Sequence, residues 1–366
     1  MQYTYLGKTG LKVSELCLGA MTFGPDWGWG ADEPTSRAIF DAYVGAGGNF
    51  VDTANVYTNG TSETFVGRFI KGRRDRFVVA TKYTISTDGA DANAYGNGRK
   101  SFMRALENSL KRLGTDYIDL YYAHMWDGYT PVDETMRAME DACRQGKILH
   151  VGLSDFPAWL VARADAIAEL SRTVRPAAIQ IEYNLLQRDA DRELIPMADS
   201  LGLSILDWSP LAGGTLTGKT LNDADDGRVS TGAVGHFDKY KTESVEKLVR
   251  KLLNVAQTLQ VSPAQLAIAW LRAVSPLHIP IVGARSVEHI RDNLRATELK
   301  LDGETLLAID ELTRASLGFP SDFLASGWPA WFGAWPARID PRVRPRARRA
   351  LRLDDDQWPR RPSRDR

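Results

Sequence analysis

The sequence predicts a single α/β domain of the (β/α)8 TIM-barrel class, with a short β-hairpin before the barrel and a C-terminal tail that we expect to be disordered. Two observations predict this class. Eight short apolar runs alternate with amphipathic segments along most of the 366 residues, and a doubly wound sheet rarely has so many strands. No change of composition before residue ~317 marks a second domain.

The elements follow one another in a regular order. Two runs, Tyr3–Leu6 and Leu11–Val13, form the hairpin around a turn at residues 8–10. The barrel strands are the apolar, β-branched or aromatic runs Glu15–Leu18, Phe50–Asp52, Phe77–Thr81, Ile118–Ala123, Ile148–Leu153, Ala178–Ile181, Ser204–Trp208 and His278–Val282. The helices between them are Pro34–Ala46, Ser62–Lys71, Lys100–Leu113, Val132–Gln145, Pro157–Leu170, Arg188–Leu201, Ser244–Leu259, Pro263–Ala273 and Val287–Ala296. Pro34 in a first turn and Gly114 after a last turn are typical helix boundaries.

Three segments depart from this alternation. Residues 211–238 form a Gly-, Asp- and Thr-rich stretch of the kind that serves as a lid or binding loop. Residues 321–337 form a Trp-rich loop that is either a hydrophobic plug on the barrel or a wall of the substrate pocket. Residues 338–366 form an Arg/Pro-rich tail whose few large apolar residues cannot offset the entropy cost of ordering it. The barrel is therefore expected to span residues 1–320.

Charge and composition exclude several classes of function. The formal net charge is zero, but 11 arginines and five aspartates give residues 338–366 a charge of +6. No aromatic platform or recognition-helix pattern accompanies this basic tail, so we expect no nucleic-acid partner. The chain begins without an apolar signal segment and has no long uncharged apolar run, so we expect a cytoplasmic protein without a membrane span. Neither Cys17 nor Cys143 has metal-site spacing, and we expect no metal.

Polar side chains follow the second, third and fourth predicted barrel strands. They are Asp52 with Tyr57, then Lys82, then His124. Each residue also has an ordinary structural interpretation. Asp52 could be a cap and Tyr57 a packing residue, while Lys82 could be a solvated strand end and His124 a structural histidine. Together they would meet at the C-terminal face of the barrel, where such barrels keep their chemistry. A cation beside a phenol lowers its pKa from about 10, so Lys82, held by Asp52, equips Tyr57 to protonate a carbonyl oxygen.

Seven motifs, in order, carry a resemblance to the aldo-keto reductase family over about residues 1–320. They are GGNFVDTANVYTNGTSE (47–63), RFVVATK (76–82), LGTDYIDLYYAH (113–124), GKILHVGLSDF (146–156), IQIEYNLLQR (179–188), WSPLAGGTLTGK (208–219) and PIVGARS (280–286). The resemblance implies an NADPH-dependent oxidoreductase that reduces an aldehyde or ketone to an alcohol without a metal. It also implies a catalytic tetrad in which Tyr57 is the general acid, Lys82 and Asp52 assist it, and neutral His124 orients the carbonyl oxygen while the nicotinamide donates hydride.

By the same resemblance, a further group of residues would hold the cofactor. Ser154, Asp155 and Gln180 would meet the carboxamide, Trp208 would lie under the nicotinamide ring, Ser209, Leu211, Gly214 and Lys219 would line the pyrophosphate, and Gly283, Arg285, Ser286, His289, Asp292 and Asn293 would surround the adenosine end. The fork of Arg285 suits a 2′-phosphate and favours NADPH over NADH.

Three positions depart from the family's usual residues. Asp155 stands where Asn is most common, and a carboxylate can accept a hydrogen bond from the carboxamide NH2 but cannot donate one to its oxygen. His289 and Asp292 stand where Gln and Glu are more usual, which bears on the adenine contacts and on the strength of the NADPH preference.

The substrate is predicted only as a small carbonyl compound. Trp27, Trp29 and Trp126 follow the first and fourth strands and either rim the substrate pocket or anchor loops; aryl aldehydes, sugars and ring ketones suit such a rim equally. The alternative function is an NADPH-binding, redox-sensing regulatory subunit with slow turnover. Residues 213–220 match a phosphate-loop pattern, but the loop that follows them contains little helix, which argues against an NTPase. Nothing in the sequence predicts an oligomeric state.

Overall fold

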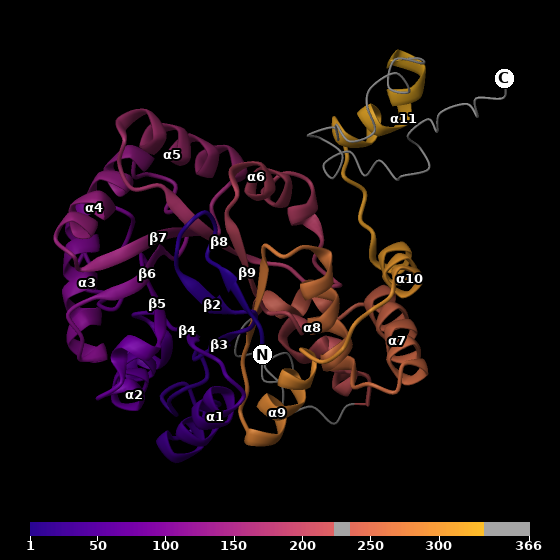
Figure 1. The fold of residues 1–366 in the computed structure, drawn as a ribbon, viewed down its shortest axis with the longest axis horizontal. Coiled ribbons are helices and arrows are strands. Elements are labelled where there is room, and N and C mark those ends of the chain that lie inside the picture. Colours follow the sequence, from indigo (N-terminus) through magenta and orange to yellow (C-terminus); the bar gives the residue numbers. More distant parts are fainter. Residues whose placement is uncertain (223–234, 333–366) are drawn as a thin grey trace.

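The computed structural model describes residues 1–222 and 235–332. Eight parallel strands close into a barrel in the order β10-β3-β4-β5-β6-β7-β8-β9, which confirms the predicted (β/α)8 class. Figure 1 shows the strands at the centre and the helices around them. The strands are β3 (Cys17–Gly19), β4 (Phe50–Asp52), β5 (Val78–Tyr83), β6 (Ile118–Ala123), β7 (Ile148–Ser154), β8 (Pro176–Glu182), β9 (Ser204–Trp208) and β10 (His278–Val282).

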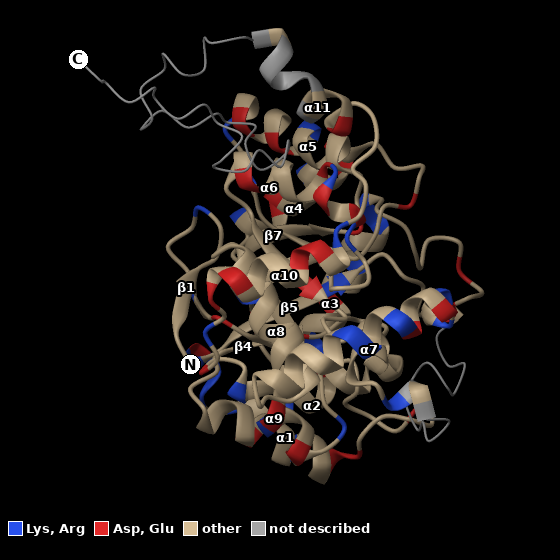
Figure 2. Cartoon of the chain, turned by 90° about the vertical axis from the view of Figure 1, so that its right-hand side faces the viewer, with Lys and Arg blue, Asp and Glu red and all other residues tan. Residues whose placement is uncertain are grey.

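Two hydrophobic cores lie on the two sides of the barrel wall. Because side chains alternate along a strand, Leu120 and Tyr122 of β6 belong to the cluster inside the barrel. Tyr121 and Ala123 belong to the larger cluster that packs the wall against the helices. Charged residues lie mainly on the helices and loops, while the strands are mostly uncharged (Figure 2).

The predicted N-terminal hairpin closes one end of the barrel. Strands β1 (Tyr3–Tyr5) and β2 (Lys12–Ser14) pair in antiparallel fashion. Beside them, Leu6 is fully buried in the inner cluster, and the backbone N–H of Gly7 donates to Ser204 Oγ, at the first residue of β9, over 2.7 Å. The hairpin therefore covers the N-terminal ends of the strands, and the opposite end is left for chemistry.

The helices occur close to where the sequence predicts them. They are α1 (Glu33–Gly45), α2 (Thr61–Ile70), α3 (Arg99–Leu113), α4 (Val132–Arg144), α5 (Ala158–Ser171), α6 (Leu194–Leu201), α7 (Glu243–Thr258), α8 (Pro263–Val274) and α9 (Val287–Arg295). Local signals define several of these ends. Ser262 and Gln265 form a capping box at the start of α8, and Gly114 ends α3 in the left-handed conformation.

Three elements differ from the prediction. Helix α6 begins only at Leu194, because the preceding residues form a 3-10 turn, η3 (Asp189–Asp191), around the side chain of Arg188. Helix α10 (Gly303–Thr313) was not predicted, and it packs against α7. The predicted Trp-rich loop of residues 321–337 contains helix α11 (Ser321–Phe332), which lies apart from the barrel in Figure 1. The predicted tail of residues 338–366 lies outside the described residues. No helix in the described part of the chain is both long and apolar enough to cross a membrane.

Candidate active site

A cavity of about 750 Å³ lies at the C-terminal ends of the barrel strands and extends to α9. Most of the residues predicted for the site line it. They are Trp27, Asp52, Tyr57, His124, Ser154, Asp155, Gln180, Trp208, Ser209, Leu211, Gly214, Lys219, Gly283, Arg285, His289, Asp292 and Asn293. Its volume and mixed lining are typical of a small-molecule or cofactor site.

Lys82 is the centre of the polar cluster, although it lies behind the cavity wall. Its ammonium is fully buried and donates three hydrogen bonds, to Asp52 Oδ2 (2.6 Å), the carbonyl oxygen of Thr53 (2.7 Å) and Tyr57 Oη (3.1 Å). The other carboxylate oxygen of Asp52 accepts from Gln180 Nε2 at 2.9 Å. All three protons of the ammonium are therefore engaged, so Lys82 has one fixed position beside the Tyr57 hydroxyl.

The neighbourhood of Lys82 shifts three pKa values. Burial lowers the pKa of Lys82, but attraction from Asp52 and Tyr57 outweighs it and the net pKa is raised. Burial raises the pKa of the Asp52 carboxyl, and Lys82 limits that rise. For Tyr57, burial again raises the pKa and Lys82 only partly opposes it. From the residue types alone, Lys82 is predicted to lower the pKa of Tyr57. In the structure desolvation is the larger effect, so the hydroxyl keeps its proton at neutral pH.

His124 completes the predicted tetrad. Its ring meets that of Tyr57 edge to face, with centroids 5.7 Å apart. Burial, and then the positive charge of Lys82, lower the pKa of His124 well below its ordinary value, so the imidazole is neutral at physiological pH. The ring atom Nδ1 is buried and has no partner among the described residues.

The residues that were predicted to bind the nicotinamide end of a cofactor lie at the ends of β7, β8 and β9. Ser154 is almost fully buried, lines the cavity, and its hydroxyl has no partner among the described residues. Asp155 follows with a positive φ of 50°, a conformation that Asp tolerates better than most residues. Its carboxylate accepts a hydrogen bond from Trp208 Nε1 at 3.1 Å. The residue after β7 and the last residue of β9 are therefore linked by a hydrogen bond beside the cavity.

Beyond Trp208 the chain bends sharply along the cavity. Ser209 has a φ of 56°, and its hydroxyl accepts from the backbone N–H of Gly213 at 2.9 Å. Gly213 and Gly214 have φ values of 68° and 106°, which favour glycine. The segment up to residue 222 consists of 3-10 turns, η4 (Ala212–Thr217) and η5 (Lys219–Asn222), and not of the α-helix that a phosphate loop would open.

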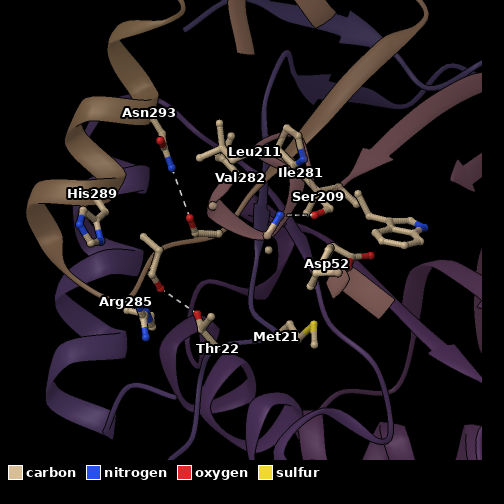
Figure 3. Close-up of a pocket in the computed structure, with 18 of the residues that line it drawn as sticks. Met21, Thr22, Asp52, Ser209, Leu211, Ile281, Val282, Arg285, His289 and Asn293 are labelled. Carbon is tan, nitrogen blue, oxygen red and sulfur yellow. Dashed lines mark hydrogen bonds between the residues drawn. The ribbon is translucent and has the colours of Figure 1, made fainter. Parts of the chain in front are cut away.

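The far end of the cavity is formed by the loop after β10 and by α9 (Figure 3). Asn293 Nδ2 donates to the carbonyl oxygen of Gly283 at 3.2 Å, and Thr22 Oγ1 donates to that of Ala284 at 2.8 Å. Ser286 caps α9 by accepting from the backbone N–H of His289. Arg285 therefore stands at a helix N-terminus, where backbone N–H groups and a guanidinium suit an anion.

Comparison with known proteins places the chain in a family. Residues 15–314 match the sequence model of the aldo/keto reductase family. The chain belongs to the aldo/keto reductase family. The chain is 39% identical over 322 residues to an uncharacterised oxidoreductase of Bacillus subtilis (strain 168), a match that covers 85% of this chain and 96% of the relative.

Two further relatives have more specific names. An aryl-alcohol dehydrogenase [NADP(+)] of Phanerodontia chrysosporium is 37% identical over 85% of both chains. A norsolorinic acid reductase of Aspergillus flavus is 35% identical over 86% of this chain and 81% of the relative. The chain is therefore an oxidoreductase, and the family and these names support carbonyl reduction.

Four residues that were predicted for the site do not line the cavity. Lys82 lies behind Asp52 and Tyr57, and Ser286 serves as the cap of α9. Trp29 packs on Trp27, with ring centroids 5.6 Å apart, and Trp126 packs at a right angle on Trp159. Of the three predicted pocket tryptophans, Trp27 alone lines the cavity.

The sequence prediction missed several residues that line the cavity. Met21 and Thr22 lie two and three residues after the end of β3, so the rule that pointed to Asp52 could have indicated them. Ser262 also lines the cavity. Its sequence context marks it as part of a capping box, but a capping box predicts only where a helix starts. His236 and Phe237 come from the long loop, where no periodic pattern marks which side chains face the cavity. In the described part of the chain, no group of three or more His, Cys, Asp or Glu is arranged to hold a metal ion.

Proposed function

We propose that this chain catalyses the NADPH-dependent reduction of an aldehyde or ketone to an alcohol, with Tyr57 as the general acid. The observation that carries the proposal is the buried ammonium of Lys82, which touches both the Asp52 carboxylate and the Tyr57 hydroxyl. A buried ion pair is weak evidence for stability. An ion pair whose cation also contacts the hydroxyl of a cavity-lining tyrosine is more informative, because ionisable groups with shifted pKa values concentrate at active sites.

Tyr57 would give its proton to the carbonyl oxygen of the substrate. The pKa of its hydroxyl is raised by burial, so the acid form is the one present at neutral pH. The phenolate left after proton transfer would lie 3.1 Å from the Lys82 ammonium, which stabilises negative charge as it develops. Asp52 and the Thr53 carbonyl hold that ammonium in place and need not move during the reaction.

His124 would orient the carbonyl oxygen. The imidazole is neutral because its pKa is lowered, so it has one N–H donor and does not compete with Tyr57 as a strong acid. Its position next to the Tyr57 ring allows both groups to address the same oxygen. His124 would therefore fix the direction of the hydrogen bond to the carbonyl oxygen, and Tyr57 would supply the proton.

The residues present fit a nicotinamide dinucleotide. The Ser154 hydroxyl is buried, faces the cavity and has no partner among the described residues, as expected of a group that binds a ligand. Gln180 keeps its amide oxygen as an acceptor because its nitrogen donates to Asp52. When bound, reduced nicotinamide supplies the hydride that the tetrad cannot. The residues proposed to hold the remainder are Asp155, Trp208, Ser209, Leu211, Gly214, Lys219, Gly283, Arg285, Ser286, His289, Asp292 and Asn293.

NADPH is proposed over NADH because of Arg285. Arg285 directly precedes Ser286, the N-cap of α9, and a guanidinium and a helix N-terminus both favour a phosphate. One of the relatives is named for NADP(+). A 2′-phosphate at this end of the cavity would account for both observations.

The relatives' names make aryl carbonyl compounds the first substrates to test. Trp27 lines the cavity and meets the Tyr57 ring edge to face, with centroids 6.4 Å apart. An aromatic ring placed beside the proton donor would gain apolar contact with this indole. Sugars and ring ketones complete the screen, since stacking on tryptophan serves them too.

The test follows NADPH absorbance with purified protein and a set of aromatic aldehydes, ketones and keto-sugars. We expect turnover with at least one class. Tyr57→Phe should lower kcat at least about 100-fold, the scale of a general acid, while the Kd for NADPH stays close to that of the parent. A Phe variant with near-parental kcat would contradict the assignment of Tyr57. Tight NADPH binding with negligible turnover on every compound would favour a regulatory subunit instead.

A further inference from the structure

A carboxylic acid lies at the nicotinamide end of the cavity proposed above. Asp155 directly follows β7, and its backbone N–H donates to the carbonyl oxygen of Gln180 at 3.1 Å, which extends the pairing of β7 with β8. Its side chain lines the cavity beside Ser154 and accepts the hydrogen bond from Trp208 Nε1. The carboxyl group is therefore positioned by backbone and side-chain contacts and also faces the ligand space.

The basic side chains around this end of the cavity contact other carboxylates. On η6 (Gly235–Tyr240), His236 and Lys239 contact Glu182 Oε2 at 2.8 and 2.7 Å. Tyr240 donates to the other oxygen of Glu182 at 2.6 Å. On β5, Lys82 is held by its own carboxylate partner from β4. The donor that the structure places on the Asp155 carboxyl, within the described residues, is the neutral N–H of Trp208.

These surroundings disfavour the ionised form of Asp155. Although the side chain is exposed to the cavity, the protein around it restricts its hydration, and this desolvation raises its pKa to about 6. The hydrogen bond from Trp208 opposes that rise, the charge of Glu182 adds to it, and Lys82 and His236 oppose it. The carboxyl group is thus neutral in mildly acidic solution and negative above it.

We propose that Asp155 discriminates between the oxidised and the reduced form of the bound nicotinamide cofactor. The nicotinamide ring carries a positive charge when oxidised and none when reduced, so an adjacent carboxylate attracts one form only. Protonation of Asp155 removes the charge and with it the discrimination. This inference rests on the proposed function, because it takes the nicotinamide end of the cofactor to lie beside Ser154, Asp155 and Trp208.

The size of the effect follows from electrostatics at a partly solvated site. A pair of unit charges near a protein surface interacts strongly enough to change an affinity by roughly a factor of ten or more, and solvent in the cavity reduces the effect toward that lower figure. We therefore expect NADP+ to bind about tenfold more tightly when Asp155 is ionised. The affinity for NADPH should change little.

The test measures Kd for NADP+ and for NADPH by tryptophan fluorescence quenching between pH 5.5 and 8.0. The quantity of interest is the ratio Kd(NADP+)/Kd(NADPH). In the parent protein this ratio should fall about tenfold as the pH rises through about 6. The 2′-phosphate also changes its charge near pH 6, but it is common to both cofactors and cancels in the ratio.

Three variants separate Asp155 from its neighbours. Asp155→Asn keeps the shape, the tolerance of a positive φ and an acceptor for Trp208, and it should show a pH-independent ratio equal to the parent's value at low pH. Ser154→Ala removes an uncharged contact and should weaken both cofactors while the pH dependence of the ratio persists. His236→Asn removes the imidazole whose charge acts on Asp155, and the dependence should again persist.

The outcomes are distinguishable. A parental ratio that does not change with pH, or an Asp155→Asn variant that behaves like the parent, would overturn this inference while the proposed function stands. Loss of the dependence in His236→Asn, with retention in Asp155→Asn, would assign it to the imidazole instead. If neither cofactor binds to the parent protein, the proposed function fails and this inference fails with it.

Discussion

Replacement of Lys82 by Met tests the centre of the proposed site. Met has a similar length and no charge, so it fills the space but removes the three hydrogen bonds to Asp52, the Thr53 carbonyl and Tyr57. The Asp52 carboxylate, which is almost fully buried, keeps only the hydrogen bond from Gln180. The variant therefore contains a buried charge without its counter-ion.

The magnitude follows from that uncompensated charge. Removing one partner of a buried ion pair typically costs about 3–5 kcal/mol, and about 2 °C of melting temperature corresponds to each kcal/mol in a chain of this size. We expect Lys82→Met to melt about 6–10 °C below the parent near pH 8. Burial raises the folded-state pKa of Asp52 further once the cation is gone, so stability is lost as pH rises through that value, and the deficit should be smaller near pH 5.

A matched variant shows whether the charge is the cause. Adding Asp52→Asn to Lys82→Met removes the uncompensated carboxylate, so the double variant should recover much of the lost stability when thermal unfolding is followed by circular dichroism. Lys82→Met should be nearly inactive both alone and together with Asp52→Asn. Lys82→Met combined with Tyr57→Phe should have a kcat little lower than that of either single variant, because the two residues act as one unit. A Lys82→Met protein that melts within 2 °C of the parent would refute the reasoning. So would full additivity of the two losses of stability when Lys82→Met is combined with Asp52→Asn.

Three further predictions concern other parts of the molecule. Arg285→Ala should weaken NADPH binding far more than NADH binding in fluorescence titrations, since it removes a charge-assisted contact to the 2′-phosphate; equal losses would place that phosphate elsewhere. Because the pKa of His124 is lowered by burial and by a neighbouring cation, His124→Asn should reduce kcat but leave the shape of the pH profile of kcat/KM between pH 6 and 8 unchanged; a step that disappears in the variant would show that the imidazole titrates there. Gly152→Ala would place a Cβ 2.2 Å from a ring atom of Tyr122 and should lower the melting temperature by several degrees, while Gly303→Ala, which meets nothing within 4 Å, should not.

The barrel and its polar strand ends could be predicted because the signals are local. Each strand is a short apolar run, and all eight predicted barrel strands overlap the observed ones to within two residues at each end. Asp52 and Lys82 were recognised because each lies where such a run stops. The closed topology then brings the ends of β4 and β5 together, since Asp52 pairs with Ala80 only two residues before Lys82. Position along the strand thus carried most of the information about the site.

The parts that could not be predicted depend on contacts between distant segments. Helix α6 starts late because Arg188 is held by Asp191 and by Asp310, and Asp310 is far away in the sequence. Helix α10 is an exception, because the sequence contains a local signal for it. Asp302 caps this helix by accepting a hydrogen bond from the backbone N–H of Thr305.

Electrostatic balance was equally inaccessible from the sequence. The expectation that Lys82 would dominate the pKa of Tyr57 came from the residue types alone, whereas the structure adds the larger cost of desolvation. The sequence indicated which groups meet, but the degree of burial decides which effect is larger.

The same desolvation gives the proposed site its chemical logic. In water a tyrosine hydroxyl and a lysine ammonium would interact weakly, because solvent screens their charges. Inside the barrel, Lys82 has no exposed surface, so its charge acts on Asp52 and Tyr57 with little screening. Isolated burial of this ammonium would be very unfavourable, and Asp52 makes it tolerable by forming the ion pair. The carboxylate therefore keeps a cation charged beside the proton donor, which requires three residues from one barrel face and explains why no single one of them identifies the site.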